Sequence, residues 1–208
     1  DLKTNTKIKK IYKDEVFYLT DQNDKTYTFD YLIIATGGKS YPKTGSDGNG
    51  YLLACKLGHK IIDPRAVLVP IFINNKLSLK AQSFKDVSLN IKTKDENINV
   101  SGDLLINGNF LTGPAALKAS SFILGKNIVK FSIDFLPDLT YNELEKHILD
   151  LIGDNTKKTL GNALRSLINS SFLEEILRLG KIDINKNVSE LTKEDRKAIV
   201  TYIKDFKI

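Results

Sequence analysis

The sequence of 208 residues contains no methionine, no tryptophan, one cysteine and two histidines. A single cysteine cannot form an internal disulfide, so nothing points to an oxidising compartment, and we expect a cytoplasmic location. No apolar run approaches the ~18 residues that a membrane-spanning helix needs, so we expect no membrane partner. Because a chain that begins at Asp1 and lacks methionine has no translation start of its own, we interpret it as a fragment of a longer protein.

Arginine is also scarce, since only four of the 31 basic residues are arginines. The formal net charge of +6 is spread along the chain and is interleaved with 25 acidic residues. Nucleic-acid sites favour arginine and a clustered basic stripe. The nearest cluster, the lysines of residues 3–13, fits the solvated face of an exposed strand. We therefore expect no nucleic-acid partner.

The two histidines, His59 and His147, stand alone in the sequence. Neither belongs to a metal-ligand spacing or to a hydrolase triad pattern, so we expect no metal site. A hydrophobic content of 41% and a charged content of 27% are typical of a globular protein. The length suits one large domain or two small ones.

Within residues 7–29 the apolar positions alternate, which predicts short antiparallel strands over residues 7–12, 16–20 and 26–29. Residues 31–35 form a continuous apolar run, too short for a helix and typical of an interior strand of a parallel sheet. A glycine-rich loop and a short helix over residues 51–57 follow. Strand, loop and helix together form half of a nucleotide-binding α/β unit.

From residue 66 onward the pattern changes to strands followed by helices, and we place a domain boundary near Arg65. A turn at residues 94–97 predicts a hairpin, and Pro114 suits the first turn of a helix. Thr192 and Asp195 have nearly the spacing and chemistry of a capping box. The predicted strands cover residues 66–73, 87–91, 98–100, 104–106 and 128–136, and the predicted helices cover residues 114–123, 141–152, 159–168, 172–179 and 193–204.

Residues 35–45 are the richest segment for chemistry. After a parallel strand, residues without side chains let the backbone approach a nucleotide, while N–H groups and hydroxyls hold phosphate or ribose. The alternative is a tight turn whose glycines only supply positive φ. A Walker-type ATP site is disfavoured, because Ile33 stands where that motif needs glycine and Pro42 interrupts the following helix.

A second candidate is the loop of Thr112, Gly113 and Pro114, which leads into a helix. Free N–H groups at a helix start attract negative charge on a ligand. The alternative is ordinary helix initiation with Thr112 as the cap, and the residues by themselves favour it.

Residues 31–58 closely resemble the BaiN/YhiN-like family of FAD-dependent oxidoreductases, also called the aminoacetone oxidase family. With the preceding Asp30, this segment is DYLIIATGGKSYPKTGSDGNGYLLACKLG. The resemblance covers nearly the whole chain, and its first block is the most specific. It continues through residues 59–70, 102–105, 110–115, 136–139 and 157–164.

In that family, an inserted domain of strands and then helices interrupts an FAD-binding Rossmann-like domain. The resemblance therefore implies a mixed α+β and α/β fold. Residues 1–65 would be a partial Rossmann-like FAD-binding domain with a β-meander, and residues 66–208 the inserted domain of antiparallel strands followed by a helical bundle. The chain would be the central fragment of an FAD-dependent oxidoreductase, inactive by itself, that acts on a small-molecule substrate with NAD(P)H as a possible electron donor.

The resemblance assigns binding residues but no catalytic residue. Loop residues 112–114 would help shape the substrate pocket. The alternative is a non-catalytic binding or interaction module built on residues 66–208, in which the glycine-rich loop is only structural. The residues assigned to the FAD site are Ala35, Thr36, Gly37 and Gly38, with Ser40 and Tyr41 as further candidates.

Overall fold

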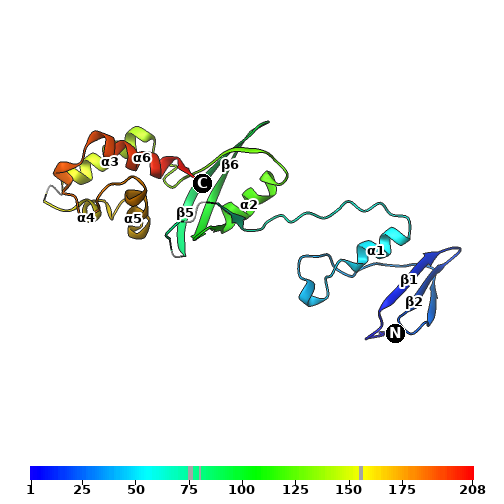
Figure 1. Ribbon diagram of the computed structural model, residues 1–208. Helices are drawn as coiled ribbons and strands as arrows, with labels where there is room; N and C mark the ends of the chain where they lie inside the picture. The colour runs from blue at the N-terminus through cyan, green and yellow to red at the C-terminus, as the bar shows by residue number, and fades with distance from the viewer. Residues whose placement is uncertain (75–76, 80, 155–156) are drawn as a thin grey trace. The chain divides into compact units, whose positions relative to one another are not determined.

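The structure is a computed structural model that describes residues 1–74, 77–79, 81–154 and 157–208 (Figure 1). The chain divides into two compact units, residues 1–65 and residues 66–208. Both contain antiparallel strands and at least one helix, which confirms a mixed α+β composition. Over the ranges described, none of the helices has both the length and the apolar character that crossing a membrane requires.

The first unit begins with a three-stranded antiparallel sheet in the order β1-β2-β3. Its strands are β1 (Ile8–Lys13), β2 (Phe17–Asp21) and β3 (Thr26–Phe29), close to the predicted ranges. Asp21 is buried at the end of β2, where its carboxylate accepts two backbone N–H groups of the following turn and the hydroxyl of Tyr27. These contacts fix the connection from β2 to β3.

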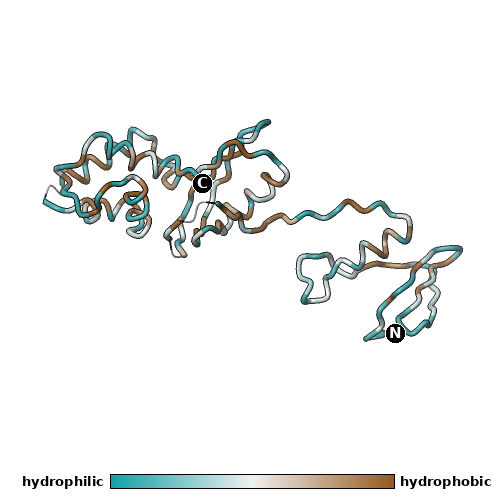
Figure 2. The backbone as a smooth tube through the Cα atoms, in the orientation of Figure 1, coloured by the Kyte–Doolittle hydropathy of each residue, from teal (hydrophilic) through white to brown (hydrophobic). Residues whose placement is uncertain are grey.

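The strand predicted over residues 31–35 is not formed. Residues 31–38 belong to no helix or strand, and Tyr31 and Ile33 are 90% and 88% exposed. Figure 2 shows the run as a hydrophobic stretch of the tube beside the strands of this unit. A strand needs hydrogen-bonding neighbours as well as apolar side chains. Among the described residues none pairs with this run, so the Rossmann-like layer is not seen.

A glycine-rich loop leads from this run to helix α1 (Asn49–Lys56). The loop contains a short 3₁₀ turn, η1 (Pro42–Thr44). Gly48 is the N-cap of α1 and has a left-handed backbone, with φ 85°. The helix begins two residues before the predicted start, because a glycine accepts this conformation without strain.

The second unit contains a six-stranded sheet in the order β4-β7-β6-β5-β8-β9, and all neighbouring strands are antiparallel. A bulge between Phe84 and Val87 lets β5 continue as one long strand opposite β6. The strands predicted separately over residues 98–100 and 104–106 are both parts of β6. Of the predicted strand over residues 66–73, only two residues pair. The strands are β4 (Ile71–Phe72), β5 (Gln82–Thr93), β6 (Asn97–Asn107), β7 (Phe110–Thr112), β8 (Ile128–Asp134) and β9 (Phe206–Lys207).

Helix α2 (Pro114–Ile123) covers one face of this sheet and has the predicted bounds. Figure 1 shows it against β5 and β6. Its contact side carries Ala115, Ala116 and Ala119, which are fully buried. Such small side chains let the helix lie close to the strands.

The remaining helices, α3 to α6, are inserted in the chain between β8 and β9. Thr140 and Thr192 cap α3 and α6 with complete capping boxes, which is why both helices start at the predicted residues. Helix α4 is much shorter than predicted. The helices are α3 (Tyr141–Gly153), α4 (Leu160–Leu164), α5 (Ser170–Leu179) and α6 (Lys193–Lys204), with a 3₁₀ turn η2 (Val188–Glu190) before α6.

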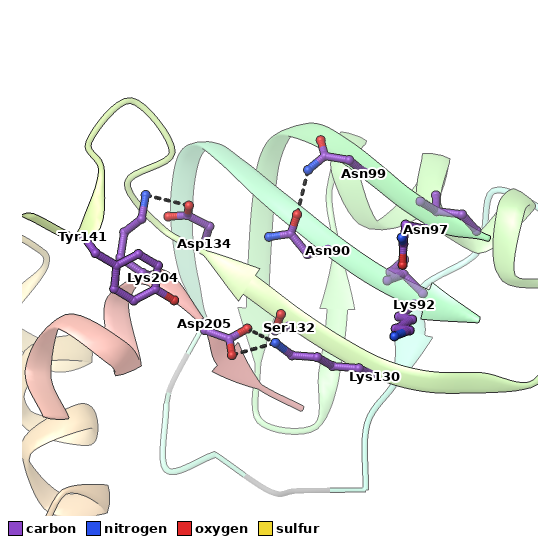
Figure 3. A pocket seen from close by; sticks show the side chains of 12 residues that line it. Asn90, Lys92, Asn97, Asn99, Lys130, Ser132, Asp134, Tyr141, Lys204 and Asp205 are labelled. Carbon is purple, nitrogen blue, oxygen red and sulfur yellow. Dashed lines mark hydrogen bonds and ion pairs between the residues drawn. The ribbon is translucent and has the colours of Figure 1, made fainter. Parts of the chain in front are cut away.

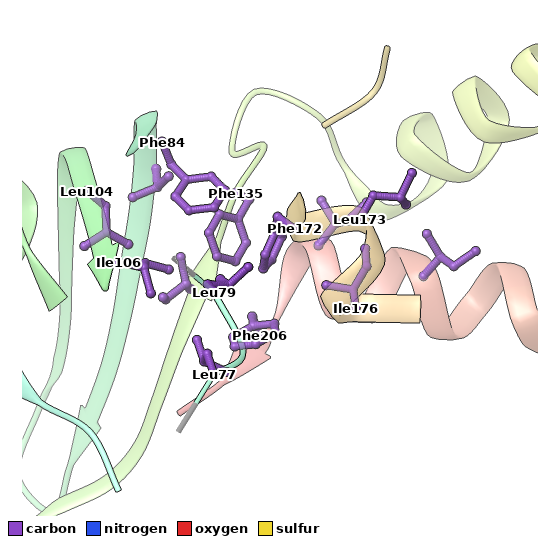
Figure 4. Packing of buried hydrophobic residues seen from close by; sticks show 14 of the residues in the cluster. Leu77, Leu79, Phe84, Leu104, Ile106, Phe135, Phe172, Leu173, Ile176 and Phe206 are labelled. Carbon is purple, nitrogen blue, oxygen red and sulfur yellow. The ribbon is translucent and has the colours of Figure 1, made fainter. Parts of the chain in front are cut away.

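An aromatic cluster joins the sheet to these helices (Figure 4). Phe84 on β5, Phe135 after β8, Phe172 on α5 and Phe206 on β9 lie with ring centroids between 4.2 and 5.8 Å apart. All four side chains are buried. Each buried aromatic ring contributes several kcal/mol of hydrophobic stabilisation, so sheet and helices share one core.

Candidate functional site

The glycine-rich loop of the first unit folds back on the start of α1. Gly37 has φ +73°, and a Cβ atom at this position would lie 2.5 Å from Ser46 Oγ. A Cβ atom at Gly50 would overlap Thr36 Oγ1. The positive φ favours glycine at position 37, and the missing side chain at position 50 leaves room for the Thr36 hydroxyl at the start of α1.

A hollow of about 380 Å³ lies beside this contact, at the first turns of α1. The methylene groups of Lys39 pack on Gly48, and its ammonium lies 6.0 Å from the centroid of the Tyr51 ring. Asp47 accepts the backbone N–H of Asn49 at 2.9 Å, so one free donor of the helix start is already used. The hollow is thus a mixed surface with one ammonium, the carboxylates of Asp47 and Asp63, and one aromatic ring.

The six residues assigned to the flavin site from the sequence differ in their surroundings. Ala35, Thr36 and Gly37 are exposed and Gly38 is partly buried, with their backbone outside any sheet or helix. Ser40 and Tyr41 are exposed, and the Tyr41 side chain is open to solvent. Instead the Tyr41 carbonyl accepts the backbone N–H and the hydroxyl of Thr44, at 3.0 and 2.7 Å. The structure brings Thr36 and Gly37 to the start of α1, while the role of all six residues stays a prediction.

Residues 112–114 belong to the second unit and form the start of α2. The N-cap is Gly113, so the alternative that Thr112 caps the helix is wrong. Gly113 has φ 91° and ψ 170°, a conformation that is essentially restricted to glycine, and a Cβ there would lie 3.0 Å from the carbonyl oxygen of Asp103. Close packing on β6 therefore explains this glycine. A contribution of residues 112–114 to a substrate pocket stays a prediction.

The sequence analysis missed a polar surface on the second unit, on the sheet face opposite α2. Three neighbouring strands place three polar residues each in directly paired positions on this face, and we call these nine residues, of which Ser88 and Ser132 are buried, the polar sheet face. It borders a pocket of about 510 Å³ (Figure 3). Its rows across β6, β5 and β8 are Asn97, Lys92 and Lys130; Asn99, Asn90 and Ser132; and Ser101, Ser88 and Asp134.

Amides and hydroxyls are connected within this face. Asn99 Nδ2 donates to Asn90 Oδ1 and to Ser88 Oγ, both at 2.7 Å. Ser101 Oγ lies 3.5 Å from Asn99 Oδ1. The side chains are therefore held in place before any ligand arrives. Alternating Ser88, Asn90 and Lys92 is the sequence signal that was available, but the pairing of β5 with β8 was not.

Charged groups border the same pocket (Figure 3). Lys130 pairs with Asp205 at 2.6 Å, and Lys204 pairs with Asp134 at 2.7 Å. Burial acts to raise the pKa of the Asp205 carboxyl, but the hydrogen bond from Lys130 and neighbouring positive charge hold it below its ordinary value. Burial and then the charge of Asp205 raise the pKa of Tyr141. The Asp205 carboxyl is therefore ionised at neutral pH, and the Tyr141 phenol keeps its proton.

Metal binding has no support in the part of the chain that the structure describes. No group of three or more His, Cys, Asp or Glu side chains comes together there in a way that fits a metal ion. Cys55 is a free, exposed thiol on α1.

Comparisons with known proteins point to one family. The model of the HI0933-like protein barrel and H2TH domain matches residues 65–208. The ribosomal RNA dihydrouridine synthase of Escherichia coli is 28% identical over 199 residues, 95% of this chain and 48% of the relative. The synthase of the same name from Haemophilus influenzae is 26% identical over 200 residues, with the same coverage of 95% and 48%.

A third relative is the 3-dehydro-bile acid delta(4,6)-reductase of Clostridium scindens, 25% identical over 169 residues, 78% of this chain and 41% of the relative. The chain spans about half the length of the curated relatives it matches. Together these matches support a flavoprotein oxidoreductase-like region. Because the family model covers the entire second unit, this chain belongs to the HI0933-like family.

Proposed function

We propose that this chain is part of a flavin-dependent reductase that acts on a carbon–carbon double bond conjugated with a carbonyl group. The observation that carries the proposal is what its relatives' names share. Dihydrouridine is uridine with its ring double bond reduced, and a delta(4,6)-reductase of a 3-dehydro bile acid reduces double bonds in conjugation with a ketone. Hydride addition to such a bond is chemistry that a bound flavin supplies.

FAD is the proposed flavin, and the resemblance to the BaiN/YhiN-like family supports this choice. The exposed backbone of residues 35–37 fits a group that must approach the main chain closely, because no bulky side chain stands over it. Glycine at positions 37 and 50 keeps this backbone against α1. In the proposal, residues 35–38 orient the cofactor, and NAD(P)H is the electron donor.

The apolar run over residues 31–35 supports a finer point of the same proposal. Its side chains alternate between exposed and partly buried, as those of a strand do, but its apolar face is bare. We propose that this run becomes a strand of a Rossmann-like FAD domain when the rest of that domain is present. The second unit then serves as the substrate-facing domain, with residues 112–114 at the pocket.

The test is to purify the product of the full-length gene and to measure its visible flavin absorption. We expect bound flavin near one equivalent, bleached by NADH or NADPH without oxygen. Gly37→Ala should lower the flavin content, because the new methyl group meets Ser46. Gly45→Ala is the matched control, since Gly45 also has positive φ but has open space around it.

A folded full-length protein that stays colourless after reconstitution with FAD would refute the proposal. That result would favour the alternative of a non-catalytic binding module. If flavin binds but neither uracil rings nor conjugated ketones are reduced, the flavin site stands and the reaction class is wrong.

A further inference from the structure

A groove of about 830 Å³ lies in the second unit, between helix α6, strand β9 and the chain before β5. Its apolar residues come from four separate segments, and Figure 4 shows two of them, Leu77 and Phe206, next to each other. A hollow of this size with a mainly apolar lining is the usual form of a small-molecule site. The apolar lining residues are Leu77, Leu179, Ala198, Tyr202 and Phe206.

The floor of this groove is recessed and elongated. Leu77 and Phe206 are 5% and 2% exposed, and the other three apolar residues are half-buried. One wall is a row along α6, whose members recur at helical spacing and therefore share one side of the helix. At 1.5 Å per residue the row is roughly 12 Å long, which suits a slender ligand better than a flat protein surface. The row consists of Lys197, Ala198, Thr201, Tyr202 and Asp205.

The hydroxyl groups of this row are already engaged. Thr201 Oγ1 donates to the carbonyl oxygen of Lys197 at 2.8 Å, and Tyr202 Oη donates to the carbonyl oxygen of Leu179 at 3.2 Å. Each hydroxyl has only one hydrogen to donate. A ligand with carbonyl oxygens along its body therefore finds no hydroxyl donor at either residue, whereas a hydrocarbon chain needs none.

The free charge beside the groove is positive. Lys197 and Lys207 both belong to its lining, and over the described ranges neither lysine takes part in an ion pair. Asp205, the carboxylate among the described lining residues, pairs with Lys130 at 2.6 Å. Because Asp205 lies near Lys207 in the chain and repels an anion there, Lys197 at the other end of the row is the better contact for a negative group.

We propose that this groove binds a fatty acid, with the carboxylate at the Lys197 ammonium and the alkyl chain along α6 toward Phe206 and Leu77. Removal of the alkyl chain from water supplies most of the affinity. The ion pair with an exposed lysine adds little free energy but sets the direction of the ligand. The inference goes beyond the proposed function, because the groove has its own lining, which is made of residues other than 35–38 and 112–114.

The test is isothermal titration calorimetry of decanoate into the 208-residue chain and, separately, into the full-length protein. Decanol has the same chain without the charge and should bind about threefold more weakly, which is the effect of one exposed ion pair. Lys197→Ala should weaken the binding of decanoate by the same factor and leave that of decanol unchanged. Lys193→Ala is the matched control, because Lys193 is an exposed lysine of the same helix outside the lining.

Ala198→Asp tests the apolar part of the groove. The new carboxylate would lie against the alkyl chain, and burying a charge without a partner is unfavourable. Both ligands should therefore bind about tenfold more weakly to this variant. Circular dichroism of each variant excludes misfolding as the cause. Lys197 is exposed, so its variant decides the question even if Ala198→Asp does not fold.

Four results would overturn the inference. They are no binding of decanoate to the folded wild-type chain, equal losses in Lys193→Ala and Lys197→Ala, tighter binding of cholate than of decanoate, and binding to the 208-residue chain but not to the full-length protein. The third result would assign the groove to a rigid steroid acid. The fourth would show that another part of the full-length protein covers it.

Discussion

Removing the Glu175 carboxylate tests how the chain before β5 is attached to the helices. Glu175 lies on α5 and is 3% exposed. Its Oε1 accepts the backbone N–H of Ser78 at 3.0 Å and Arg178 Nη2 at 2.8 Å, and its Oε2 accepts Arg178 Nε at 2.8 Å. Leu77 and Leu79, on either side of Ser78, are both buried. The carboxylate therefore holds this segment where its leucines reach the core.

Glu175→Ala removes one charge-assisted hydrogen bond to the backbone, worth about 1.5–3 kcal/mol. The bond to Arg178 adds little, because the Arg178 side chain is 56% exposed and regains water. We expect the free energy of unfolding to fall by about 2 kcal/mol, and the melting temperature by roughly 5–10 °C for a unit of this size.

The assay is urea and thermal unfolding followed by far-ultraviolet circular dichroism. Glu174→Ala is the matched control, because Glu174 is the exposed neighbour on the same helix. A loss in Glu175→Ala no greater than that in Glu174→Ala would show that the carboxylate does not secure the segment, and the reasoning would fail.

Two further predictions concern acid and glycine. The hydrogen bond from Arg178 lowers the pKa of Glu175 below 4.5, against the opposing effect of burial. A carboxyl whose pKa is lower in the folded state than in the unfolded state stabilises the fold fully above the unfolded-state pKa, and this stabilisation is lost as the pH falls through the folded-state pKa. The free energy of unfolding of the wild type should therefore drop below about pH 4.5 more steeply than that of Glu175→Gln. Parallel profiles for the two proteins would contradict this. Gly113→Ala should lower the free energy of unfolding in urea by about 2–3 kcal/mol, because the backbone conformation is glycine-specific and β6 lies against the new Cβ. Gly108→Ala is the control and should lower it by about 1 kcal/mol, because Gly108 has φ 59° with open space around it. Equal losses in the two variants would refute the packing argument.

Local signals explain the elements that the sequence predicts well. Pro114 marks the start of α2, and Thr192 with Asp195 marks the start of α6, since each signal lies within one turn of the helix that it controls. Where local chemistry decides the backbone, a single sequence is sufficient.

Non-local pairing explains what the sequence does not predict. Residues 31–35 have the composition of a strand, but composition supplies no hydrogen-bonding neighbour. The polar sheet face exists only because β5 pairs with β8 in one register. Ser78 and Glu175 are 97 residues apart in sequence, and nothing in either segment announces the other.

The insertion of α3 to α6 between β8 and β9 means that the chain leaves the sheet and returns to it side by side, since Ile133 pairs with Phe206. The helices are an insertion between two neighbouring strands. A short turn in their place would make β8 and β9 an ordinary hairpin with the strand order unchanged. Such an excision would leave Phe84, Phe135 and Phe206 open to water without Phe172. The connectivity of the sheet does not require the helices, but the burial of its aromatic side chains does.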